Sequence, residues 1–180
     1  MNICIFCGSG TGNSPVYTDA AKEMASLLCE TGSTLVYGGG NIGLMGVLAD
    51  QILRREGKVI GVIPDFLMQK EVGHAGLTQL EVVGSMHERK RRMADLADAF
   101  IALPGGWGTL DELAEILTWK QLGLIQASVG ILNTHHYFDS LLSQMEIMVR
   151  EGFLQSKNLQ EIRVADTPKK LLIQLGVISV

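Results

Sequence analysis

Residues 99–112 read Ala-Phe-Ile-Ala-Leu-Pro-Gly-Gly-Trp-Gly-Thr-Leu-Asp-Glu, an apolar run followed by a glycine-rich turn. The run at 99–103 is short, bulky and uninterrupted, which is typical of a strand buried inside a parallel sheet. Leu113, Ile116 and Leu117 then recur at helical spacing. Glycines let an anion approach the amides of the turn, and the helix N-terminus behind them presents free N–H groups. The stretch therefore predicts a strand, a phosphate-binding turn and a helix.

The same alternation of strand and helix runs through the chain. We expect strands at 3–7, 34–37, 59–63, 80–83, 99–103 and 129–132, and helices at about 15–28, 44–55, 86–97, 109–122 and 138–149, with a last helix from Pro168. Residues 65–78 have weak periodicity and predict a long loop, with or without a short helical piece. Repeated units of this length predict a Rossmann-like α/β fold, with a mainly parallel sheet and helices on both faces. Residues 1–180 are expected to form one domain, whose ligands bind at the carboxyl ends of the strands.

Composition narrows the class of function. The net charge of the 180 residues is −4, so bulk charge gives no case for binding nucleic acid. No apolar run approaches the ~18 residues that cross a membrane, and no secretory leader precedes the first strand. Cys4, Cys7 and Cys29 fit neither a disulfide framework nor a zinc pattern, and we interpret them as small buried residues in a reducing compartment. We therefore expect a cytoplasmic protein that binds neither nucleic acid nor membrane.

The four histidines do not point to a metal site. His135 and His136 are expected to open a helix, while His74 and His87 stand alone. No pair has the spacing of metal ligands on a helix. The sequence indicates neither a bound metal nor a cofactor.

Two further loops at the predicted ligand edge are rich in glycine. Residues 8–12 follow the first strand and residues 38–43 follow the second. Neither 38–43 nor the turn at 105–108 spells a Walker A loop or the G-x-G-x-x-G fingerprint of dinucleotide-binding proteins. Their amides could help to hold a phosphate, whereas the glycines of 40–46 could equally serve close packing of a helix on the strands. The candidate substrate contacts in these loops are Ser9, Gly39, Gly40 and Gly43.

One arginine is predicted to face the interior. Met86, Met93, Leu96 and Ala97 share one stripe of the helix at 86–97, and Arg89 lies inside that stripe. A buried guanidinium is costly unless it meets an anion. Either a structural ion pair or a phosphate or carboxylate of a substrate would satisfy it, and we favour the substrate. The neighbouring Lys90 lies at the edge of the stripe, and Arg91 and Arg92 are expected in solvent.

Two acidic residues open the helix after the turn at 105–108. Glu112 lies at the border of the core face and is the candidate for a pocket. Asp111 is turned away and is expected in solvent, where it complements the helix dipole. Trp119 and Leu122 form a second apolar strip on the side of Glu112. This strip predicts packing either against another chain or under the long loop.

The motifs resemble those of the LONELY GUY family, which are cytokinin riboside 5′-monophosphate phosphoribohydrolases often labelled lysine decarboxylases. Residues 104–112 match the family motif P-G-G-x-G-T-x-x-E, with Trp107 at its variable position. Residues 86–90 resemble the arginine–lysine segment of the family, and residues 37–46 its first glycine loop. The likeness spans roughly residues 2 to 150.

The resemblance implies a homodimer that hydrolyses the N-glycosidic bond of a nucleoside 5′-monophosphate, releasing a free base and ribose 5-phosphate. Arg89 and Glu112 occupy the positions expected to be catalytic. The site is expected to lie close to the dimer interface. The implied substrate contacts are Glu71, Lys90, Gly105, Gly106, Trp107, Gly108, Thr109 and Thr118.

A mechanism follows from these positions. Ribosidic cleavage passes through an oxocarbenium-like state, so a carboxylate at Glu112 would stabilise positive charge and orient water. Glu71 either contacts the ribose hydroxyls or shares the role of base, and Arg89 either fixes the substrate or polarises the leaving group. The base that the pocket prefers stays open.

Two other functions compete with hydrolysis. A non-catalytic nucleotide-binding or molybdenum-cofactor-carrier-like protein would share the glycine loops but would not need Arg89 together with Glu112. A lysine decarboxylase would need a lysine bound to pyridoxal phosphate, and Lys58, Lys120 and Lys157 show no context for one.

Overall fold

The structure is a computed structural model that describes residues 1–71 and 73–179, with the backbone alone for residues 69–71. Within these residues seven strands form one sheet in the order β4-β3-β2-β1-β5-β6-β7, and every neighbouring pair is parallel. The strands are β1 (Asn2–Phe6), β2 (Thr34–Tyr37), β3 (Val59–Pro64), β4 (Gln79–Val83), β5 (Ala99–Ala102), β6 (Ser128–Leu132) and β7 (Ile162–Ala165). The predicted Rossmann-like α/β fold is confirmed, and the sheet is wholly parallel.

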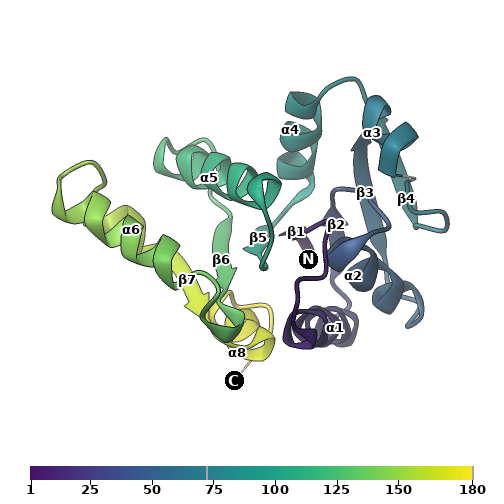
Figure 1. Ribbon diagram of the computed structural model, residues 1–180, viewed down its shortest axis with the longest axis horizontal. Helices are drawn as coiled ribbons and strands as arrows, with labels where there is room; N and C mark the ends of the chain where they lie inside the picture. The colour runs from purple at the N-terminus through teal and green to yellow at the C-terminus, as the bar shows by residue number, and fades with distance from the viewer. Residues whose placement is uncertain (72, 180) are drawn as a thin grey trace.

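Helices cover both faces of this sheet. Successive side chains of a strand point to opposite faces, so Ile3 and Ile5 of β1 face one core and Cys4 and Phe6 face the other. The first core is closed by α1 (Pro15–Glu30), α2 (Gly43–Leu53) and α8 (Pro168–Gln174). The second is closed by α4 (Met86–Leu96), α5 (Trp107–Gln121) and α6 (Asp139–Arg150). Figure 1 shows α1 and α2 on one side of the central strands and α4 and α5 on the other.

Two elements were not predicted from the sequence, and a third was allowed for. The segment expected to be a long loop begins with a helix, α3 (Asp65–Glu71), which is the short helical piece the prediction allowed. A short helix, α7 (Ser156–Gln160), and the edge strand β7 were not predicted. In β7 the burial alternates along four residues, so its sequence lacks the continuous apolar run of an interior strand. None of the helices in the described residues combines the length and apolar composition that crossing a membrane requires.

The expectation that His135 and His136 open a helix is wrong. They lie in the short 3-10 turn η1 (Thr134–His136), and both have left-handed backbone conformations, with φ of 53° and 60°. The α-helix begins later, at Asp139. The reason is local: the Asn133 side chain accepts a hydrogen bond from Phe138 N at 2.7 Å, which holds this turn ahead of α6.

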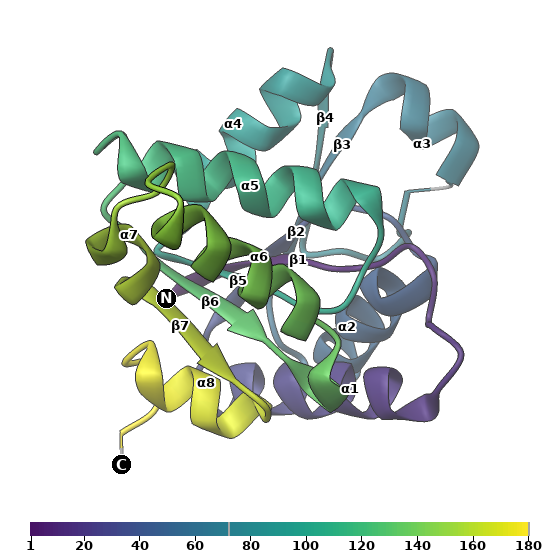
Figure 2. The same cartoon turned by 60° about the vertical axis from the view of Figure 1, so that its left-hand side comes forward.

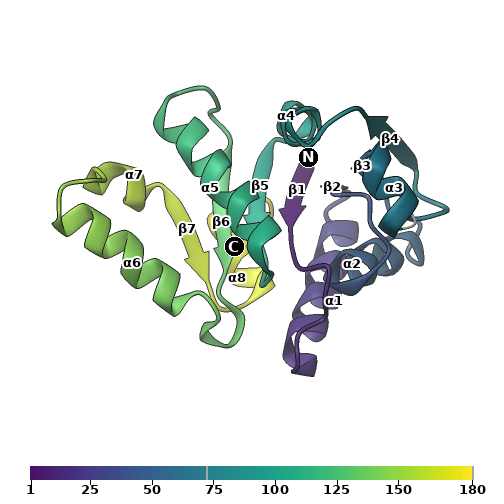
Figure 3. The same ribbon diagram turned by 45° about the horizontal axis from the view of Figure 1, so that its top comes forward.

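Because the strands are parallel, the loops after β1, β2 and β5 lie at one edge of the sheet, and the strand order reverses between β1 and β5. Ligands of doubly wound sheets bind at such a reversal. Gly8 N donates to Pro104 O at 3.1 Å, and Leu44 N donates to Gly8 O at 3.0 Å. These bonds join the loop after β1 to the loop after β5 and to the start of α2. Figure 3 shows β1 and β5 side by side, with α3 and β4 at one end of the sheet and α6 and β7 at the other.

Candidate active site

A cavity of about 260 Å³ opens at this edge of the sheet. It combines residues of β1 and of the loops after β1, β2 and β5 with side chains from α2, α3, α4 and α5. The lining residues are Ile5, Cys7, Gly8, Ser9, Gly38, Met45, Leu67, Met86, Arg89, Gly106, Trp107, Gly108, Thr109 and Glu112. The structure thus brings together the predicted pair of Arg89 and Glu112 with Ser9 and the turn at 106–109.

Arg89 faces the interior, as predicted. The Ser85 side chain caps α4 by accepting from Glu88 N at 3.2 Å, and the Glu88 carboxylate accepts from Gly84 N at 2.7 Å. One turn into the helix, the Arg89 guanidinium donates through Nε to Val62 O at 3.2 Å. A Cβ on Gly38 would overlap the guanidinium, so a residue without a side chain leaves the space that Arg89 fills.

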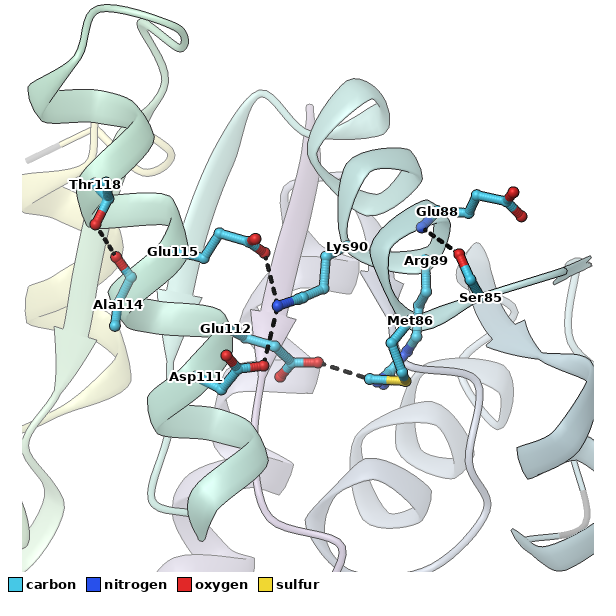
Figure 4. A network of polar contacts seen from close by, with 10 residues as sticks. All are labelled: Ser85, Met86, Glu88, Arg89, Lys90, Asp111, Glu112, Ala114, Glu115 and Thr118. Atoms are coloured by element: carbon cyan, nitrogen blue, oxygen red, sulfur yellow. Dashed lines mark hydrogen bonds and ion pairs between the residues drawn. The ribbon is translucent and has the colours of Figure 1, made fainter.

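Glu112 is the partner of this arginine. Its Oε1 lies 3.3 Å from Arg89 Nη1, and the two residues are 7% and 8% exposed, respectively. Figure 4 shows the two side chains meeting between α4 and α5. Burial raises the pKa of Glu112 to about 7, although Arg89 favours the ionised form. The carboxyl group can therefore gain or lose a proton near neutral pH, as a general acid or base must.

Lys90 lies beside this pair but outside the lining of the cavity. Its Nζ is 3.1 Å from both Asp111 Oδ2 and Glu115 Oε2, so it joins α4 to α5 (Figure 4). Burial lowers the pKa of Lys90, but the hydrogen bonds that Lys90 donates to Glu115 and Asp111 outweigh burial and raise it. Asp111 is exposed, as predicted.

The two arginines that follow differ from each other. Arg91 is exposed, as expected, and pairs with Asp95 at 2.9 Å. The Arg92 side chain is 42% exposed, and its guanidinium also donates to both oxygens of Glu81 in β4, at 2.6 and 2.9 Å. The pair depends on the distance between α4 and β4, which the helical pattern alone does not contain.

The start of α5 leaves backbone donors free to face a ligand. Gly106 occupies the cap position without a capping side chain, and Leu110 N is the first amide to bond back, to Gly106 O at 3.2 Å. Within the described residues Thr109 Oγ1 is buried and has no hydrogen-bond partner. A Cβ on Gly105 would overlap Thr109 Oγ1 and lie 2.8 Å from Gly8 N. Trp107, 88% exposed, stands at the rim of the cavity.

Several predicted contacts lie away from this cavity. Gly39 and Gly43 have φ of 78° and 62°, and a Cβ on Gly43 would overlap the backbone of Ser9. Gly40 bridges to Gly73. For Gly40 and Gly43 this geometry fits the close packing that the sequence left open as the alternative for residues 40–46. Thr118 donates to Ala114 O at 2.8 Å and lines a separate groove between α5 and α6. The side chain of Glu71 lies outside the described residues.

The predicted contacts do not include seven residues of the lining: Ile5, Cys7 and Gly8 in or just after β1, Gly38 after β2, and the apolar helix residues Met45, Leu67 and Met86. Gly38 belongs to a glycine cluster that was noticed, but only the register of β2 against α4 shows which glycine faces Arg89. The three apolar helix residues carry no local signal that separates a cavity wall from the core. Cys4 and Cys7 are free and buried, as predicted, and burial raises the pKa of both thiols.

Known proteins resemble this chain in both sequence and fold. Residues 45–175 match a family model described as "Possible lysine decarboxylase". The cytokinin riboside 5′-monophosphate phosphoribohydrolase LOG of Oryza sativa subsp. japonica is 46% identical over 96% of this chain and 72% of its own length. LOG1 of Arabidopsis thaliana, which has the same enzyme name, is 46% identical over 96% of this chain and 81% of its own length.

Solved structures share the fold at lower identity. The molybdenum cofactor binding protein of Rippkaea orientalis superposes with a TM-score of 0.72 at 24% identity, covering 99% of this chain and 97% of its own. The Moco carrier protein of Chlamydomonas reinhardtii gives 0.69 at 20% identity, covering 97% and 98%. These likenesses show the fold alone, whereas the matching family model and the closely similar sequences show the family. The chain belongs to the LOG family of cytokinin riboside 5′-monophosphate phosphoribohydrolases.

Proposed function

We propose that this protein hydrolyses the N-glycosidic bond of a nucleoside 5′-monophosphate, giving a free base and ribose 5-phosphate. The observation that carries the proposal is the buried ion pair of Arg89 and Glu112 in the same cavity as the uncapped start of α5. A carrier would need the anion-binding turn but would gain nothing from a buried carboxyl group whose pKa lies near 7. The names of the relatives, which are phosphoribohydrolases, support the same reaction.

The 5′-phosphate is held at the start of α5. The amides of 107–109 lie in the first turn, where the helix leaves its N–H groups unbonded and the dipole favours an anion. The buried Thr109 hydroxyl, without a partner among the described residues, can donate to a phosphate oxygen. Ser9 lines the same cavity and supplies a second hydroxyl. This arrangement gives one end of the substrate a fixed place.

Glu112 acts at the bond that breaks. As the base leaves, positive charge develops on the sugar, and a carboxylate nearby stabilises it. Water supplies the hydroxyl group that bonds to the anomeric carbon, the bond to the base nitrogen breaks, and the proton lost by water passes through Glu112 to the departing base. General acid–base help of this kind typically contributes ~10²–10⁴-fold.

Arg89 tunes the carboxyl group and meets the substrate. Its guanidinium favours the ionised form of Glu112 against burial, and so keeps the pKa close to neutral. Nε is already used by Val62 O and Nη1 faces Glu112. The planar fork has further N–H groups that can donate to a ribose hydroxyl or to the leaving base.

The protein is proposed to work as a homodimer in the cytoplasm. An apolar groove of about 350 Å³ runs between α5 and α6, which lie side by side in Figure 2. Leu122, Leu124 and Phe153 are exposed near the ends of these helices. α3, at the start of the predicted long loop, packs on β3 and β4, and Leu122 is exposed, so a second copy is the better candidate to cover the strip. The three free cysteines fit a reducing compartment.

Incubation with AMP and with isopentenyladenosine monophosphate, followed by chromatography of the free base, tests the proposal. Release of base together with ribose 5-phosphate is expected, and the ratio of the two rates gives the preference for the base. Tight nucleotide binding without released base would instead favour a carrier. A protein that absorbs near 400 nm and binds no nucleotide would favour a pyridoxal phosphate enzyme.

A further inference from the structure

A second cavity, of about 290 Å³, adjoins the catalytic one behind the turn at 104–106. The two cavities share Gly8, Ser9 and Gly106. Tyr17 of α1 and Tyr137 line the second cavity, and their rings meet edge to face with centroids 5.8 Å apart. Tyr137 comes from the segment between β6 and α6, which supplies nothing to the catalytic cavity among the described residues.

Tyr137 directly contacts the turn at 105–108, which is the proposed anion-binding turn. Its hydroxyl donates to Gly105 O at 2.5 Å. Because a trans peptide is planar, the carbonyl of Gly105 and the N–H of Gly106 point in opposite directions. A hydrogen bond that holds the carbonyl towards Tyr137 therefore directs the Gly106 N–H away from Tyr137. The same turn is held on its other side by Gly8 N, which donates to Pro104 O at 3.1 Å.

The two residues before Tyr137 adopt an unfavourable backbone conformation, which places the Tyr137 side chain next to Gly105. His135 and His136 are consecutive residues with φ of 53° and 60°, in the left-handed region that side chains rarely adopt. Tyr137 N donates to Thr134 O at 3.2 Å, which closes this short turn. The Tyr137 side chain stays substantially exposed, so burial of its ring is not what the turn achieves. What it achieves is the contact with Gly105.

We infer that Tyr137 is a positioning residue for the anion-binding turn, acting on the phosphate end of the substrate and not on the bond that breaks. The inference rests on the proposed function, in which this turn holds the 5′-phosphate. The turn donates equally to the phosphate of the substrate and of the transition state. Loss of the Tyr137 hydroxyl therefore weakens binding of phosphorylated ligands and leaves kcat nearly unchanged.

The test compares Tyr137→Phe with Tyr17→Phe, which removes a hydroxyl from the same cavity without touching the turn. Calorimetry measures Kd for ribose 5-phosphate and for adenosine, and steady-state assays give KM and kcat for AMP. In Tyr137→Phe the Kd for ribose 5-phosphate and the KM for AMP are expected to rise about tenfold, the effect of one hydrogen bond. The Kd for adenosine and kcat stay within twofold, and Tyr17→Phe resembles the wild type.

An unchanged affinity of Tyr137→Phe for ribose 5-phosphate would overturn the inference. Equal losses for ribose 5-phosphate and adenosine, or the same loss in Tyr17→Phe, would show a merely structural role and would also overturn it. The calorimetric comparison needs no turnover. A wild-type protein that binds ribose 5-phosphate but does not cleave AMP would therefore refute the proposed function and leave the inference about Tyr137 to be decided by the binding data. Failure of the wild type to bind ribose 5-phosphate would overturn both.

Discussion

Glu112 makes stability depend on pH, and one substitution isolates the effect. Burial raises its pKa from 4.5 to about 7 in the folded chain, whereas unfolding returns the side chain to water and its pKa to the ordinary value. Between these pH values the folded state binds more protons than the unfolded state. Stability from this group is therefore greatest below about pH 4.5 and is lost as the pH rises through about 7. The difference between the two pKa values corresponds to about 3 kcal/mol.

Replacing Glu112 with Gln removes this titration. Urea unfolding of the wild type and of Glu112→Gln at several pH values gives the free energy of unfolding of each. From about pH 5 to about pH 8, the wild type is expected to lose about 2 to 3 kcal/mol relative to the variant. Other titrating groups, including the four histidines, contribute to both proteins and cancel in the comparison. A difference that stays constant across this range would refute the reasoning, because it would mean that burial does not raise the pKa of Glu112.

Three further predictions concern the turn, the arginine and the groove. Gly105→Ala is expected to lower the melting temperature by several degrees, because the added Cβ would overlap neighbouring atoms. A Cβ at Gly106 meets nothing, so Gly106→Ala is expected to leave the melting temperature nearly unchanged. Equal melting temperatures for the two variants would contradict this prediction. Arg89→Met removes the group that favours the ionised form of Glu112, so the pKa of Glu112 should rise further and the acidic limb of the kcat/KM profile should move to higher pH. The value of kcat/KM at neutral pH should fall by ~100-fold or more, and an unmoved limb would refute that role. Met148→Glu places a charge in the groove between α5 and α6, where a second copy is proposed to pack. Analytical ultracentrifugation should show that the wild type is a dimer and that the variant is a monomer. A dimeric variant would show that the interface does not include this groove.

Features built from neighbouring residues in the chain could be predicted from the sequence. The unit formed by β5, its turn and α5 is one continuous stretch of sequence. A run of bulky apolar residues, followed by glycines and then by apolar residues at helical spacing, was therefore enough to predict it. The inward direction of Arg89 followed from helical periodicity alone. The parallel sheet followed from the regular alternation of such units.

Features that need two distant elements to meet could not be predicted in this way. The ion pairs of Lys90 with Asp111 and Glu115 depend on how closely α4 packs against α5, which the helical pattern of either helix does not show. The contact of Tyr137 with Gly105 requires the register of β6 against β5. It also requires a left-handed backbone at His135 and His136, where the sequence has no glycine to indicate it. The edge strand β7 was missed because alternating burial over four residues gives too weak a pattern.

The central claim is that Glu112 serves the cleavage step and not the binding of the nucleotide. The most direct test measures adenine release from AMP by the wild type and by Glu112→Gln, with AMP binding followed by calorimetry. The variant is expected to bind AMP within a few-fold of the wild type and to lose ~100-fold or more of kcat. Near-normal release of adenine by Glu112→Gln would contradict it.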